Sequence, residues 1–100
     1  MEYGLTNITS ATTTVLKDFD EYGGGLKSIQ ISNNNASNVV TVGLFLNDGT
    51  TANNAYFFKN LVIPVGASLL LTEGINFDTS ILSLQLITAG TSPDVSVIIK

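Results

Sequence analysis

The sequence contains no cysteine, no histidine, no arginine and no tryptophan. Without cysteine no disulfide bond can cross-link the chain, and without cysteine or histidine the usual structural zinc sites are excluded. The absence of histidine also removes the Ser-His-Asp and Cys-His catalytic arrangements and the commonest general base. We therefore expect a protein that is not an enzyme, with no catalytic residues, no cofactor and no metal site.

Charge is also scarce. Charged residues make up 12% of the chain, about half of the ~25% that is typical of soluble domains. The net charge of −4 argues against binding to nucleic acid or to an anionic membrane surface, both of which need a basic footprint. No apolar run is long enough to span a bilayer. Because an exterior that stays in water usually carries mixed charges, we expect part of this surface to be buried in an assembly.

Along most of the sequence, apolar and polar residues alternate. Val40, Val42, Leu44 and Leu46 share one face, and residues 29–31, 82–86 and 95–99 alternate in the same way. This period of two indicates strands with one buried face. Glycine, asparagine and proline separate the runs, which predicts an all-β fold: a single β-sandwich or jelly-roll-like domain of about seven or eight short antiparallel strands.

The predicted organisation is one sandwich domain over residues 26–100. Residues 1–25 are rich in threonine and poorly phased, so an edge strand and an arm that reaches onto a neighbouring subunit both stay open. The chain starts with neither a basic nor an apolar leader segment, so we expect it to fold in a cytoplasm.

The best candidate for a metal site is the acidic cluster at residues 18–21. Asp18, Asp20 and Gly23 match the start of a calcium-binding loop. The fifth position is Tyr22 and the twelfth is Ile29, where such a loop needs ligands. We interpret the cluster as a solvated loop, and whether Asp18 and Asp20 hold an ion stays open.

The candidate interface residues are Tyr56, Phe57, Phe58 and Leu70. Strict alternation places Phe57 on one face of a strand and Tyr56 and Phe58 on the other. A sandwich strand with one face in water is not expected to carry large apolar side chains on both faces. We therefore expect one of the two phenylalanines in the core and the other in a subunit contact. A sugar-binding aromatic platform is the alternative.

Residues 27–33 and 40–49 resemble the opening of small virion proteins of tailed bacteriophages. The most distinctive stretch is residues 56–71, in which an aromatic strand and a Pro-x-Gly turn precede an apolar strand, and residues 95–99 resemble the closing Val-rich strand. The resemblance covers about three quarters of the chain and leaves out the first 25 residues. It is a pattern of strands and turns and carries no chemical signature.

This resemblance implies a β-sandwich located in the virion and assembled in the host cytoplasm. Its implied role is a capsid cement or decoration protein: a homo-oligomer, expected to be a trimer, that contacts the major capsid protein or another virion protein. An adaptor of the neck, tail or baseplate, or a carbohydrate-binding β-sandwich module, are the alternatives.

Overall fold

The computed structural model describes residues 4–19, 25–50, 54–72 and 75–99. Ten strands form in these ranges, in the order β1 (Gly4–Ile8), β2 (Thr13–Lys17), β3 (Gly25–Leu26), β4 (Ile29–Asn33), β5 (Val40–Asn47), β6 (Asn54–Ile63), β7 (Ser68–Leu71), β8 (Ile75–Asn76), β9 (Ser83–Ala89) and β10 (Val95–Ile99).

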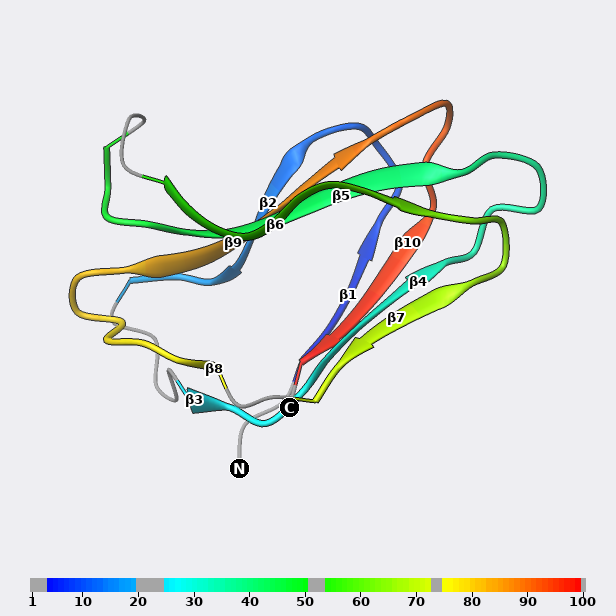
Figure 1. Ribbon diagram of the computed structural model, residues 1–100. Helices are drawn as coiled ribbons and strands as arrows, with labels where there is room; N and C mark the ends of the chain where they lie inside the picture. Colours follow the sequence, from blue (N-terminus) through cyan, green and yellow to red (C-terminus); the bar gives the residue numbers. More distant parts are fainter. Residues whose placement is uncertain (1–3, 20–24, 51–53, 73–74, 100) are drawn as a thin grey trace.

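Eight of these strands build two four-stranded antiparallel sheets that face each other (Figure 1). Sheet A has the strand order β1-β10-β4-β7, and sheet B has the order β2-β9-β5-β6. The short strands β3 and β8 pair separately with each other. The predicted all-β sandwich is therefore confirmed.

The core lies between the two sheets, and alternation decides which residues enter it. Strand β10 buries every second residue, and β4 does the same in register beside it. Sheet B contributes the inward residues of β5 and β9. Burial of such a side chain stabilises the fold by about 1.5–3 kcal/mol. The buried cluster comprises Ile8, Ile29, Ile31, Val40, Val42, Leu44, Ile63, Leu84, Leu86, Val95, Val97 and Ile99.

The N-terminal segment supplies one edge strand to each sheet. β1 pairs with β10 in sheet A, and β2 pairs with β9 in sheet B. The buried Thr88 holds the turn between them, because its Oγ1 donates to the carbonyl oxygens of Ser10 at 2.9 Å and Thr12 at 3.2 Å. Residues 4–8 and 13–17 thus pair within their own chain.

A buried amide joins the two sheets at the end of β4. Asn33 is only 2% exposed, and its Nδ2 lies 3.0 Å from the carbonyl oxygens of Asn38 and Ile63 and 3.2 Å from that of Pro64. Its Oδ1 accepts a hydrogen bond from the backbone N–H of Asn35 at 3.0 Å. Strand β4 belongs to sheet A and Ile63 ends β6 of sheet B, so one side chain fixes their separation.

We predict that Asn33→Ala lowers the free energy of unfolding by about 2–4 kcal/mol, because it leaves buried carbonyl groups without a donor. Asn34→Ala is the matched control: Asn34 is exposed and bonds Ser96 Oγ through its Nδ2, so its loss is expected to cost less than about 1 kcal/mol. Urea denaturation of both variants measures the difference. Equal losses in the two variants would show that the buried amide does not join the sheets.

Candidate functional site

Strand β6 carries two more residues than the part of β5 that it faces. Phe45 is opposite Tyr56, but Leu44 is opposite Phe58, so Phe57 is an extra residue in the ladder. A second shift separates the pair Leu44–Phe58 from Val42–Leu61. Such bulges reverse the face on which the following side chains lie.

The expectation that Tyr56 and Phe58 share a face is therefore wrong. Phe58 is opposite the fully buried Leu44 and packs against the core. Tyr56 lies beside Phe45 on the other face, with the two ring centroids 5.1 Å apart. The second shift includes Asn60, whose φ of 55° is left-handed, a conformation that asparagine adopts more readily than most residues.

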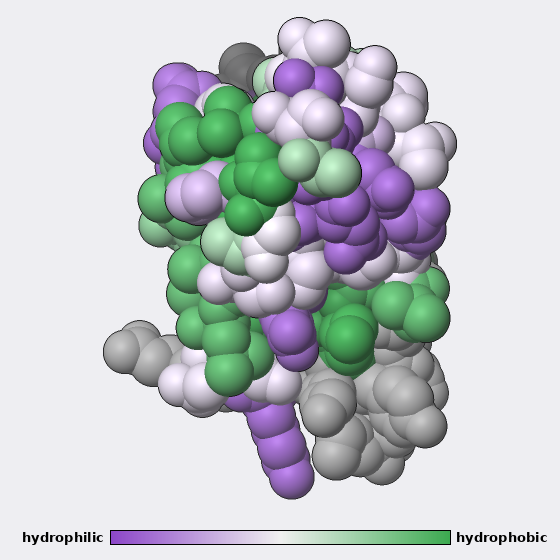
Figure 2. Space-filling model, turned by 90° about the vertical axis from the view of Figure 1, so that its right-hand side faces the viewer, coloured by the Kyte–Doolittle hydropathy of each residue, from purple (hydrophilic) through white to green (hydrophobic). Residues whose placement is uncertain are grey.

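Exposed apolar side chains gather where β6 and β7 form the open edges of the two sheets. Phe57 is 45% exposed, Val62 53%, Val65 42% and Leu70 56%. We call these four residues the β6–β7 side. Figure 2 looks onto the end of the sandwich at which β6 turns into β7. Hydrophobic residues cover much of the left part of that view, and polar residues gather at the upper right, above a second, smaller hydrophobic area.

The structure thus separates the four candidate interface residues. Phe57 and Leu70 belong to the β6–β7 side, and Leu70 points away from the core while Leu69 and Leu71 pack against it. Phe58 is half-buried against the core. Tyr56 lies on the outer face of sheet B, where Lys59 Nζ sits 5.0 Å from its ring centroid.

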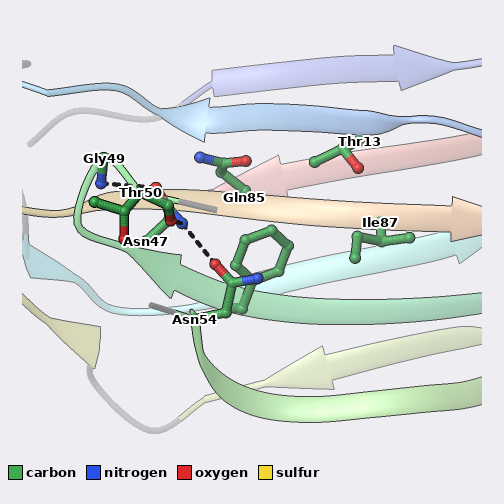
Figure 3. Close-up of a pocket in the computed structure, with 8 residues that line it drawn as sticks. Thr13, Asn47, Gly49, Thr50, Asn54, Gln85 and Ile87 are labelled. Atoms are coloured by element: carbon green, nitrogen blue, oxygen red, sulfur yellow. Dashed lines mark hydrogen bonds between the residues drawn. The ribbon is translucent and has the colours of Figure 1, made fainter. Parts of the chain in front are cut away.

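Sequence reasoning did not find a pocket on the outer face of sheet B. It has a volume of ≈ 340 Å³ and lies between the loop that follows β5 and the strands β9 and β2 (Figure 3). Phe45 and Ile87 provide apolar surface, and Thr13, Asn54 and Gln85 provide hydroxyl and amide groups. These residues come from four strands, so only the strand pairing brings them together.

The acidic residues do not form a site in the part of the chain that the structure describes. No group of three or more acidic side chains is close enough there to hold a metal ion. Asp18 Oδ1 accepts a hydrogen bond from the N–H of Phe19 at 2.8 Å, and Asp20 lies outside the described residues. The hydroxyl and then the N–H of Ser80 lower the pKa of the exposed Asp78 carboxyl, because both stabilise its ionised form.

Comparison with known proteins yields no relative. No family model, no curated protein and no solved structure matches the chain. Within the described ranges no helix is long and apolar enough to cross a membrane.

The bulged register predicts different effects of the two phenylalanines on the isolated subunit. Phe58→Ala is expected to lower the free energy of unfolding by about 2–4 kcal/mol, because a half-buried ring leaves the core. Phe57→Ala is the matched control and is expected to cost less than about 1 kcal/mol. Urea denaturation at high dilution, where subunit contacts do not contribute, measures both. A greater loss for Phe57→Ala would mean that the register is different.

Proposed function

We propose that this protein is a non-enzymatic structural subunit of a tailed-bacteriophage virion, a cement or decoration protein that forms homotrimers on the capsid. The observation that carries the proposal is the β6–β7 side, where Phe57, Val62, Val65 and Leu70 expose apolar surface at the edge of both sheets. Several large apolar side chains exposed along one side of a domain favour a contact with another protein. The phage assignment itself rests on the sequence resemblance.

The charge distribution supports a protein partner for this side. From Asn54 to Thr72 the only charged residue is Lys59, and its ammonium group lies over the Tyr56 ring. A contact here would therefore bury few charges, and the desolvation cost that opposes association would be small. Each large apolar side chain that becomes fully buried contributes about 1.5–3 kcal/mol.

The bulges in β6 favour side-chain packing over strand pairing as the mode of contact. Two register shifts within one edge strand distort the row of backbone groups that a partner strand would need. The apolar side chains remain available. We therefore place the affinity of the contact in Phe57, Val62 and Leu70.

A trimer requires that the surface meets a different surface on the next subunit, since a closed ring is built from head-to-tail contacts. The opposite edges of the two sheets are β1 and β2. They also expose apolar residues: Leu5 on β1 and Val15 on β2. Two unlike apolar sides suit a ring better than a two-fold dimer, in which one side meets itself.

The first prediction of this proposal concerns solution mass. Light scattering of the purified protein is expected to give three times the chain mass of 10.5 kDa, with dissociation into monomers only at high dilution. The double variant Phe57→Ser/Leu70→Ser is expected to shift the protein to monomers without a large change in the melting temperature of the subunit, because both side chains are exposed.

Ile81→Ser is the matched control for that experiment. Ile81 is 59% exposed and lies in the turn before β9, away from the β6–β7 side. This variant should remain trimeric. A wild-type protein that is monomeric at every concentration would contradict the homotrimer, and equal effects of the control and the double variant would contradict the choice of surface.

The second prediction concerns position in the particle. Antibodies against the chain, applied to purified virions and visualised by immunogold electron microscopy, are expected to label the whole capsid surface. Label confined to the neck, tail or baseplate would support an adaptor in place of a decoration protein. Absence of the chain from purified virions would contradict both roles.

A further inference from the structure

The base of the pocket on the outer face of sheet B is formed by an aromatic ring, that of Phe45. Phe45 points away from the core, since its neighbours Leu44 and Leu46 face inward, and yet it is only 4% exposed. Tyr56 packs against one side of its ring, at 5.1 Å between centroids. An aromatic ring at the base of a depression on a solvent-facing sheet is typical of small-molecule sites, which combine apolar surface with a few placed polar groups.

The polar wall of the pocket is held in a fixed orientation by Asn47. Asn47 Oδ1 accepts from the N–H of Gly49 at 2.7 Å, and its Nδ2 donates to the carbonyl oxygen of Thr50 at 2.6 Å. A backbone N–H only donates and a backbone carbonyl only accepts, so these bonds determine which end of the amide is nitrogen. The same Nδ2 donates to Asn54 Oδ1 at 2.6 Å (Figure 3).

This arrangement directs two unused groups toward the pocket. Because Asn54 offers its oxygen to Asn47, its Nδ2 is left as a donor, and no acceptor for it occurs among the described residues. Gln85 Nε2 donates to Ser83 Oγ at 2.9 Å, which leaves Gln85 Oε1 as an acceptor. The Thr13 hydroxyl, which also lines the pocket, can both donate and accept.

We propose that this pocket binds a neutral saccharide. None of the described side chains that line the pocket is charged, so an ionic ligand would find no counter-charge among them. A sugar ring has an apolar C–H face, which would pack mainly on Ile87 and on the small exposed part of Phe45. Its hydroxyl groups both donate and accept, which matches Asn54, Gln85 and Thr13. The volume of ≈ 340 Å³ is at the lower end of the range for small-molecule sites and suits the terminal unit of a glycan.

A second, smaller depression extends the site along the same face. It has a volume of ≈ 60 Å³ and is lined by Gly43, Tyr56 and Lys59, and Ile87 lines both depressions. The missing side chain of Gly43 contributes to this space, since a Cβ there would be in van der Waals contact with Tyr56 Cε2 at 3.7 Å. A second sugar unit would contact Tyr56 and Lys59, whose Nζ lies 5.0 Å from the centroid of the Tyr56 ring.

This inference goes beyond the proposed structural role and does not depend on it. The subunit contact is assigned to the β6–β7 side, whereas the saccharide is assigned to the outer face of sheet B. A monomer that binds sugars would support the saccharide site and contradict the homotrimer. A trimer that binds no sugar would support the homotrimer and contradict the saccharide site.

Saturation-transfer difference NMR on the full chain tests the site, with glucose, galactose, mannose, rhamnose and N-acetylglucosamine as separate probes at millimolar concentration. At least one of these neutral sugars is expected to receive saturation from the protein. Asn54→Asp keeps the oxygen that Asn47 needs but removes the amide donor, and it is expected to weaken binding at least about tenfold. Gln85→Leu is expected to do the same by removing the acceptor.

Asn34→Asp is the matched control, because it introduces the same charge on an exposed asparagine of the loop between β4 and β5, far from the pocket in the fold. It should leave sugar binding unchanged, and thermal denaturation checks that all variants are folded. The proposal is overturned if none of the five sugars binds, or if Asn54→Asp and Asn34→Asp weaken binding equally.

Discussion

The two extra residues in β6 relative to β5 determine which side chains of β6 enter the core and which are exposed. They change the spacing of inward-facing residues along this strand, so that Phe58 enters the core opposite Leu44 while Tyr56 turns outward to Phe45. Phe57 is left on the open edge, beside a strand that is too distorted for a regular partner strand. The exposed position of Phe57 and the outward position of Tyr56 both follow from this local change of register.

In this protein neutral asparagine side chains form many of the hydrogen bonds that stabilise the loops. Asn33 joins the two sheets from inside the fold, and Asn47 orders the loop that follows β5. Asn35 organises the loop after β4 in the same way, since its Oδ1 accepts from the N–H groups of Ser37 and Asn38. Each amide both donates and accepts, so it can satisfy a turn without a counter-ion. This explains how a chain with 12% charged residues retains well-defined loops, and why the pocket formed by one of these loops suits a neutral ligand.

The two surfaces differ in chemistry and therefore in the partners they suit. The four side chains of the β6–β7 side are apolar and cannot form hydrogen bonds, which favours another protein surface that can exclude water. The pocket has an aromatic floor and amides whose orientation is fixed before any ligand arrives, which reduces the cost of ordering them on binding. Because the two surfaces do not coincide, a contact through the β6–β7 side would leave the pocket open to solvent.

Sequence alone determined the fold class and most of the strands. Alternation in β4, β5, β9 and β10 assigned the core correctly, because regular strands keep a period of two. The sequence also named Leu70 as a candidate contact residue, and Leu70 is exposed between the inward-facing Leu69 and Leu71. Alternation failed at residues 56–58, since a bulge is a property of a strand pair and is not visible in one strand. The roles of Asn33 and Asn47 also required the tertiary structure, because an asparagine in a turn can act through its backbone or its side chain. The pocket depended on it entirely: Thr13, Phe45, Asn54 and Gln85 are distant in sequence, and only the order of strands in sheet B places them on one face.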